Sequence, residues 1–372
     1  MTRPIVVLSL EPWDDVWRRN QYLIDGLLRL DPALRVLFVE PAADPVYAAL
    51  SRRLPRPGAG RRVPPGGDGR LILFQPTKWL PRVAGSTADR LLRRQVTRAV
   101  RRLGWERPAL WVNDPRWAQI VVETGWPSLY DMTDDWVEAT RSGRESRRLR
   151  ETDALLLRVA DAVVVCSRGL ETSRGRVRPV HLVPNAVDVD RYRTPVARPG
   201  DLSAGEVALY AGTLHEDRLD VDLVVGTARA LRDRGASVVL VGPNALTAEN
   251  TAILEAQPNV HVLGARPWHA VPAYLQHADV LIVPHVVDGF TESLDPIKLY
   301  EYLAVGRPIA STPVAGFRER DGRGVAVARA EDFPEKVAGL IAEQPRTLPA
   351  EDVPTWDERV AAMLGILREL PA

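Results

Sequence analysis

The stretch DVLIVP, residues 279–284, and the stretch SLDPIKLYEYLAVGRPI, residues 293–309, decide the fold. The first is a short apolar run typical of a buried parallel strand. In the second, Asp295 offers an N-cap, Pro296 suits the first helical position, and Gly306 ends the helix. This order of strand, polar loop and helix predicts an anion site, because unpaired amides and the positive end of the dipole lie at a helix start.

Two charged residues lie on one face of this predicted helix. Lys298 and Glu301 are three residues apart, so their side chains are neighbours near the helix start. A cation for a phosphate beside a carboxylate for sugar hydroxyls would suit a nucleotide-sugar pocket. An exposed ion pair on an ordinary helix has the same spacing, so the spacing leaves both interpretations open.

The same segment resembles the signature of family 4 glycosyltransferases (glycosyl transferases group 1), which have the GT-B fold. In that family two glutamates face the donor, and the second holds the ribose hydroxyls. Glu301 matches the second glutamate, and Ser293 stands where the first is expected. Lys298 matches the Pro-x-Lys of one branch, which implies a phosphate-binding and catalytic role for it. We assign the neighbouring Leu299 to the same donor site.

A loop after the predicted strand 207–210 carries a second part of the resemblance. Its sequence AGTLHEDRL resembles the family's GRLxxxKG loop, in which an arginine and a lysine grip the diphosphate. Gly212 matches the glycine, Thr213 stands in for the arginine, and Arg218 stands in for the lysine. A glycine lets the backbone approach a phosphate closely, and an arginine can bind a phosphate through two hydrogen bonds.

Two further strands of the second half are expected to end in this donor site. Strand 238–241 leads into Gly242, and strand 260–263 leads into Gly264. The segment PNVHVLGARP resembles the family's PNVxFLG, which implies backbone contacts from Gly264 and Arg266 to the nucleotide base.

The first half is expected to bind the acceptor. Strands 5–10 and 35–39 flank a helix at 17–30, which predicts a doubly wound sheet. No G-x-G-x-x-G follows the first strand, which counts against a dinucleotide oxidoreductase. Loops after strand ends point into the ligand crevice of such a sheet, so Trp13 and Arg19 are acceptor-site candidates.

Carboxylates follow two later strands of this half. Asp114 follows strand 109–112, and Asp134 with Asp135 follows strand 128–130. Such groups could serve acid–base chemistry, hold a divalent metal, or merely cap the next helix. We assign Asp114 to the acceptor site and Asp134 or Asp135 to orienting or deprotonating the acceptor. The resemblance implies no essential metal and no cofactor besides the nucleoside diphosphate sugar, which is a substrate.

The composition is that of an ordinary globular protein. Of the 372 residues, 45% are hydrophobic and 26% are charged. The single Cys166 closes an apolar run and excludes disulfides. No apolar run approaches the roughly 18 residues that span a bilayer. The start of the chain enters a strand with no cleavage-site pattern, so we expect a cytoplasmic protein.

Charge is distributed unevenly. Residues 1–200 hold 34 Lys+Arg against 23 Asp+Glu, a net +11, and the remainder hold 15 against 25, a net −10. Such a basic half suggests an anionic lipid or cell-envelope precursor as acceptor, with peripheral contact to the inner face of the membrane. A merely solvated basic face would look the same. Nucleic acid is not expected, because no helix-turn-helix, zinc or RNP pattern is present.

The expected architecture is two Rossmann-like doubly wound α/β domains that face a cleft. They are an acceptor domain at 1–190, a donor domain at 203–350, and a C-terminal helix at 354–372 that crosses back to the first domain. The expected activity is a retaining transfer of a sugar from a nucleoside diphosphate sugar to a hydroxyl. A nucleotide-sugar 2-epimerase of the same fold and a catalytically silent GT-B partner subunit are the alternatives.

Overall fold

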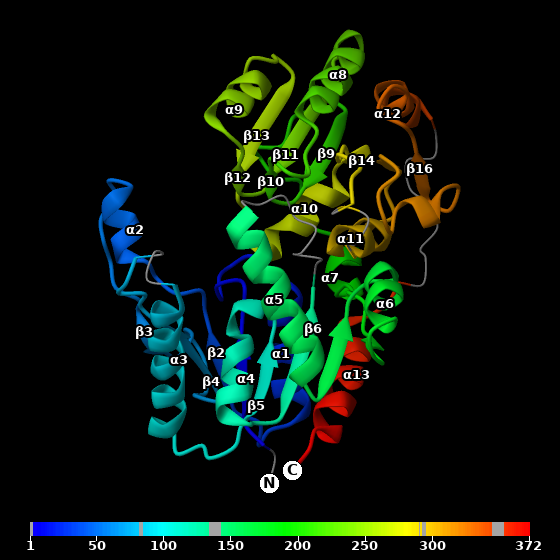
Figure 1. Ribbon diagram of the computed structural model, residues 1–372. Helices are drawn as coiled ribbons and strands as arrows, with labels where there is room; N and C mark the ends of the chain where they lie inside the picture. The colour runs from blue at the N-terminus through cyan, green and yellow to red at the C-terminus, as the bar shows by residue number, and fades with distance from the viewer. Residues whose placement is uncertain (1–2, 82–84, 134–142, 290, 292–294, 344–352) are drawn as a thin grey trace. The chain divides into compact units, whose positions relative to one another are not determined.

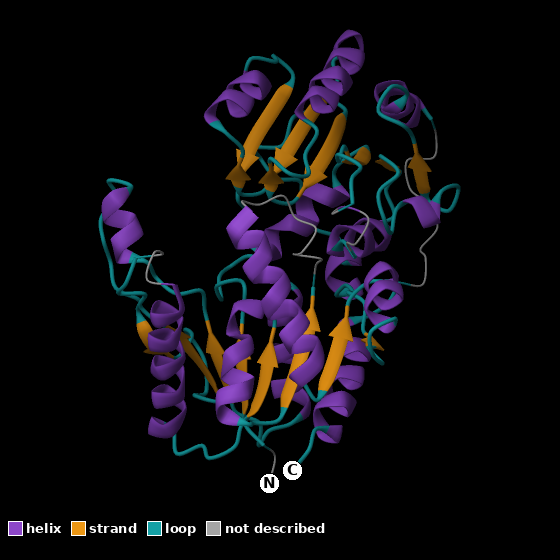
Figure 2. Cartoon of the chain, in the orientation of Figure 1, coloured by secondary structure: helices purple, strands orange, loops and turns teal. Residues whose placement is uncertain are grey.

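A computed structural model describes residues 3–81, 85–133, 143–289, 291, 295–343 and 353–372 (Figure 1). The chain divides into two compact units, one formed by Met1–Pro184 with Asp357–Ala372 and the other by Asn185–Trp356. Each unit is an α/β layer structure around a parallel sheet (Figure 2). The α/β class expected from the sequence is confirmed.

The first unit contains the earlier strands and helices of the chain. Its strands are β1 (Ile5–Leu8), β2 (Val36–Val39), β3 (Gly60–Arg62), β4 (Leu71–Gln75), β5 (Ala109–Val112), β6 (Ser128–Met132), β7 (Ala162–Val165) and β8 (His181–Leu182). Its helices are α1 (Arg19–Leu30), α2 (Pro45–Leu50), α3 (Gly85–Arg102), η2 (Pro115–Trp117), α4 (Ala118–Thr124), α5 (Gly143–Val159), α6 (Arg168–Gly175) and, at the C-terminus, α13 (Trp356–Glu369).

The sheet of this unit has the order β3-β4-β2-β1-β5-β6-β7-β8. All neighbours pair in parallel except β3, which runs antiparallel along the edge of β4. Every residue of β1 and β2 is buried, as expected for strands covered on both faces. Strand order reverses between β1 and β5, so the loops after these two strands flank the switch point at which doubly wound sheets bind ligands.

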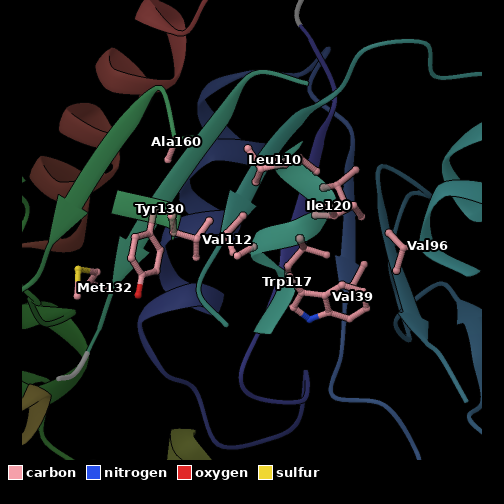
Figure 3. Packing of buried hydrophobic residues seen from close by; sticks show 14 of the residues in the cluster. Val39, Val96, Leu110, Val112, Trp117, Ile120, Tyr130, Met132 and Ala160 are labelled. Atoms are coloured by element: carbon pink, nitrogen blue, oxygen red, sulfur yellow. The ribbon is translucent and has the colours of Figure 1, made fainter. Parts of the chain in front are cut away.

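Aliphatic and aromatic side chains fill the layer between this sheet and its helices. Figure 3 shows Leu110 and Val112 of β5 packed with Ile120 of α4 and with Trp117. The hydroxyl of Tyr130 at the edge of this layer donates to Asp153 Oδ1 over 2.7 Å. The polar tip of Tyr130 is therefore satisfied where it is buried.

The C-terminal helix α13 completes the first unit. Its side chains Val360 and Met363 are buried, and Val360 lies against Gly26 of α1, where a Cβ would overlap it. A glycine in mid-helix costs stability relative to alanine, but here it allows two helices to approach closely. Residues from the two ends of the chain therefore share one core.

The second unit has the strands β9 (Val207–Ala211), β10 (Leu214–His215), β11 (Ser237–Val241), β12 (Asn244–Ala245), β13 (Val260–Gly264), β14 (Val280–Val283), β15 (Ile309–Ser311) and β16 (Val325–Val327). Its helices are α7 (Val189–Arg193), α8 (Val221–Leu231), η3 (Arg232–Arg234), α9 (Ala248–Glu255), η4 (Trp268–Ala270), α10 (Val271–Gln276), α11 (Ile297–Val305), η6 (Arg318–Arg320) and α12 (Phe333–Ala342).

The main sheet of the second unit is parallel, with the order β13-β11-β9-β14-β15-β16. Strand order reverses between β9 and β14, so the loops after these strands flank its switch point. These are the loops that carry Gly212 and the segment leading to Lys298. The topology thus brings the two parts of the predicted donor site to one edge of one sheet.

Two details of the expected elements were wrong. Helix α11 begins at Ile297 with Pro296 as its N-cap, because the Asp295 carboxylate accepts from the Asn185 amide and the Tyr300 hydroxyl instead of capping the helix. The stretch 51–70, whose many prolines and glycines predict a loop, contains β3. The strand Gly60–Arg62 could not be predicted from its own residues, because its pairing with β4 is what orders it.

Among the described ranges, none of the helices combines the length and the apolar character needed to span a bilayer. Cys166 is buried, as expected.

Candidate functional site

Two glycines bring the loops after β9 and β11 together in the second unit. Gly212 has φ +146° and Gly242 has φ +149°, a region that residues with a Cβ rarely adopt. A Cβ on Gly242 would overlap the carbonyl oxygen of Gly212, and one on Gly212 would lie 3.0 Å from Lys298 Nζ. The backbone of the first loop therefore lies directly beside the lysine of α11.

Lys298 rests on a tyrosine at the end of β9. Its Nζ donates to Tyr210 Oη over 2.7 Å and lies 3.9 Å from the centre of that ring. Burial lowers the pKa of Lys298 from 10.5 to about 7, helped by the nearby positive charge of Arg218 and opposed by Glu301. Without a ligand, this lysine lies in surroundings that disfavour its charge, and an incoming anion would reverse that.

A histidine completes this polar cluster. His285, directly after β14, is buried, and its Nε2 lies 3.1 Å from Tyr210 Oη and 3.4 Å from Lys298 Nζ. Burial, followed by the charges of Lys298 and Arg218, holds the pKa of His285 well below its usual range. The imidazole is therefore neutral at pH 7, and its backbone is fixed by hydrogen bonds with Thr312.

Arg218 lies on the same side of the sheet. Its carbonyl accepts from the Val286 amide over 2.8 Å, which ties its loop to the segment after β14. The guanidinium faces Asp217 at 3.7 Å and is partly exposed. Arg218 and Lys298 therefore place two cations at the switch point. Thr213 follows the glycine, and its carbonyl accepts from Tyr210 Oη over 3.3 Å.

Glu301 lies on the same face of α11 as Lys298, about one turn further along the helix. Tyr192 of α7 donates its hydroxyl to Glu301 Oε1 over 2.5 Å. Burial raises the pKa of Glu301, although the Tyr192 hydrogen bond and Lys298 act against that rise. Within the described ranges Oε2 has no hydrogen-bond partner, so the carboxylate can accept from further hydroxyl groups.

The remaining donor-site candidates are placed in different ways. Leu299 is buried in the core beneath α11. Gly264 has φ +74°, and its carbonyl accepts from the Gly242 amide over 3.0 Å. The loop after β13 therefore lies against the loop after β11. The Arg266 side chain is held by Asp201 and Tyr274, which leaves its backbone for the predicted base contact. Ser293 lies outside the described residues.

The acceptor-site candidates lie in the first unit. The Trp13 amide donates to Glu40 Oε1 over 3.1 Å, and its ring packs edge-on against Phe38. Asp114 is buried, caps η2 and pairs with Arg116 at 2.7 Å, so the capping interpretation describes its contacts. Asp134 and Asp135 lie outside the described residues.

Arg19 is buried in a polar cluster rather than presented to a ligand. Its guanidinium pairs with the fully buried Asp131 at 3.1 Å, and Asp131 also accepts from Trp111 Nε1 and Asn113 Nδ2. A buried charge needs such partners, and an acceptor would have to compete with them. The predicted contact between Arg19 and an acceptor therefore has no support in the geometry.

Several residues of the site were missed by sequence reasoning. Tyr210, His285 and Tyr192 contact the predicted lysine and glutamate from 13 to 109 positions away in the chain. The only available signal was position, since Tyr210 and His285 each lie at the carboxyl end of a predicted strand.

No group of three or more histidine, cysteine, aspartate or glutamate side chains is placed to hold a metal among the residues that the structure describes.

Comparisons with known proteins show what the chain resembles. Residues 205–343 match the model of the family described as Glycosyl transferases group 1. A curated Bacillus subtilis (strain 168) protein, the putative teichuronic acid biosynthesis glycosyltransferase TuaH, is 26% identical over 223 residues, which is 56% of each chain. The match therefore spans little more than half of that relative.

Two solved structures are similar over nearly the whole chain. One is Anabaena Alr3699/HepE in complex with UDP, with a TM-score of 0.60 and 16% identity over 98% of this chain and 95% of that one. The other is WaaG, a glycosyltransferase involved in lipopolysaccharide biosynthesis, with a TM-score of 0.63 and 15% identity over 97% and 95%. At such identity the likeness shows the fold, which is the one that glycosyltransferases of GT-B type have.

Proposed function

We propose that this chain, whose second unit matches the group 1 glycosyltransferases, transfers a sugar from a nucleoside diphosphate sugar to a hydroxyl group. The observation that carries the proposal is the pair of cations Lys298 and Arg218 at the β9/β14 switch point, with Glu301 on the same helix. A departing diphosphate develops negative charge, which positioned cations stabilise.

Each residue has a role in this reaction. Lys298 would leave Tyr210 to contact the diphosphate, and Arg218 would hold it through its planar guanidinium. Glu301, fixed by Tyr192, would accept from the ribose hydroxyls. Gly212 would let backbone amides approach the phosphates, and Asp134 or Asp135 would orient the acceptor hydroxyl.

The same proposal extends to the stereochemistry of transfer, its metal dependence and the acceptor. Retention at the anomeric carbon and independence of a divalent metal follow from the family resemblance. We further propose that the acceptor is an anionic lipid or a cell-envelope precursor at the inner face of the membrane. The basic first half supports this, and the curated relative's printed role in teichuronic acid biosynthesis is compatible with it.

Sugar transfer by the purified full chain tests the proposal. Nucleoside diphosphate release from UDP-, GDP- and dTDP-sugars is measured with hydroxyl acceptors, with product stereochemistry and EDTA resistance as further readouts. Lys298→Met should lower turnover about 10²- to 10³-fold, as removal of a charge-stabilising donor does elsewhere. Lys336→Met, at an exposed lysine on α12, is the matched control and should leave turnover unchanged.

Two results would contradict the proposal. Epimerised nucleotide sugar without transfer would indicate a 2-epimerase, and binding without any turnover would indicate a silent partner subunit.

A further inference from the structure

One short helix of the first unit has no fully buried residue. Helix α2 has six residues and none of them is buried. A helix this short is marginal in water on its own, and protein helices usually gain their stability from burying one face. Figure 1 shows α2 standing away from the sheet edge formed by β3.

The side chains that α2 and the following turn expose are apolar and large. Leu50 is 77% exposed and Leu54 72%, with Tyr47 and Trp79 also mostly exposed. Trp79 lies near the start of α2, because the preceding Lys78 binds Asp44, the residue that caps α2. Exposed apolar clusters of this kind mark an interaction surface on a soluble domain. We call Tyr47, Leu50, Leu54 and Trp79 the apolar tip.

Arginines adjoin the apolar tip in the sequence. Residues 45–67 contain five arginines and no aspartate or glutamate. Arg62 is bound to Glu40, but Arg52, Arg53, Arg56 and Arg61 have no ion pair among the described residues. Two acids that bind residues of this part of the unit are already engaged, Asp44 by Lys78 and Glu40 by Arg62. The tip is therefore an apolar surface next to arginines whose positive charge is not compensated by an ion pair.

The apolar tip lies at the same edge of the sheet as the expected acceptor site. Helix α2 follows β2, so it lies at the carboxyl edge of the sheet, where the loop with Trp13 also lies. Glu40 links the two places, since it accepts both from the Trp13 amide and from Arg62 of β3. A partner bound by the tip would lie beside this loop.

We propose that the apolar tip and Arg53, Arg56 and Arg61 form a docking surface for an anionic lipid bilayer. Tyrosine and tryptophan suit the boundary between headgroups and acyl chains, leucines enter the apolar layer, and arginines pair with anionic headgroups. Each basic residue near an anionic surface strengthens binding severalfold. The apolar side chains add a contribution to the affinity that salt does not screen. This docking surface deepens the proposed acceptor at the membrane, on which it rests, and vesicle binding tests it apart from sugar transfer.

Co-sedimentation of the full chain with vesicles tests this surface. Vesicles of phosphatidylcholine alone are compared with vesicles containing about a third phosphatidylglycerol. We expect binding to the anionic vesicles only. The triple variant Arg53→Gln, Arg56→Gln and Arg61→Gln should partition about a hundredfold more weakly.

A matched control removes the same charge elsewhere on the unit. Arg98→Gln, Arg101→Gln and Arg102→Gln change three exposed arginines of the basic helix α3 and should reduce partition much less. The variant Leu50→Ser with Leu54→Ser should lose the binding that persists at high salt. Thermal melts of each variant show that it is folded.

A second readout reports contact with the acyl chains. Lipids brominated in the acyl chain quench nearby tryptophan, so anionic brominated vesicles should quench the wild type more than Trp79→Phe. The proposal is overturned if neutral vesicles bind equally well, or if the α3 variant loses as much binding as the tip variant. It is also overturned if the tip arginines are needed for a nucleic acid and not for vesicles.

Discussion

Lys298 shows how one residue can balance stability against binding. Its ammonium is held by Tyr210 and the neutral His285 in surroundings that lower its pKa to about 7. The charge needed for a diphosphate is thus only partly present before the ligand arrives. Two predictions follow from this at the scale of the single residue.

Nucleotide affinity should depend on pH above neutrality. Deprotonation of Lys298 above its pKa of about 7 removes the cation, so the Kd for a nucleoside diphosphate should rise by up to about tenfold per pH unit between pH 7 and 9. Isothermal titration calorimetry should also show proton uptake on binding. Lys298→Arg keeps its charge throughout and should flatten this dependence. An equal slope in both proteins would show that another group is responsible.

The same lysine should destabilise the ligand-free protein. Its folded pKa lies below its unfolded value of 10.5, so the unfolded state binds more protons and stability rises from about pH 7 to pH 10.5. The rise is at most about 1.4 kcal/mol per pH unit. Lys298→Met should therefore be more stable than the wild type at pH 7, and the difference should shrink by pH 10. Denaturant unfolding at both pH values measures this, and a difference that grows with pH would contradict it.

At the scale of elements, the donor site depends on loops that only glycine can form. Gly242→Ala combines a strained φ with an overlap against the Gly212 carbonyl, so it should destabilise the second unit by about 1–3 kcal/mol or more. Gly226→Ala in α8 is the control, because its Cβ would meet only an ordinary contact with Pro334. That change should be neutral or stabilising by roughly 0.5–1 kcal/mol. Thermal melts of both variants check the contrast.

The elements were more predictable than the contacts between them. Strands such as 109–112 and 238–241 were visible because fully buried parallel strands are continuous apolar runs. Lys298 and Glu301 could be paired because helical spacing places them on one face. The contacts of Tyr210 with Lys298 and of Tyr192 with Glu301 join distant positions, and no local pattern specifies such pairs.

The misplaced start of α11 has the same cause. Asp295 had the sequence of an N-cap, but its carboxylate is held by Asn185 and Tyr300, so a tertiary contact overrode a local preference. Arg19 was predicted to face an acceptor from its place in a strand-end loop. The buried partner that holds it, Asp131, is 112 residues away.

At the scale of the whole molecule, the first unit is completed by the end of the chain. Met363 of α13 is fully buried, and Val360 packs against Gly26 of α1. Met363→Ala should therefore destabilise the first unit by about 2–5 kcal/mol, the usual cost of removing a buried side chain. Arg368→Ala, at an exposed position of the same helix, should change stability by no more than about 0.5 kcal/mol. Equal melting temperatures for Met363→Ala and the wild type would contradict the shared core.

The central claim for the whole molecule is that its second unit binds a nucleoside diphosphate at the β9/β14 switch point. The most direct measurement is a thermal-shift screen with UDP, GDP, dTDP and ADP, with and without Mg²⁺, on wild type, Glu301→Ala and the exposed control Glu255→Ala. A nucleotide at 100 times its Kd adds about 2.7 kcal/mol of stability. We predict a shift for one nucleotide that is indifferent to metal, kept in Glu255→Ala and lost in Glu301→Ala. If no nucleotide stabilises the wild type, or if Glu301→Ala keeps the full shift, the donor site as described is wrong.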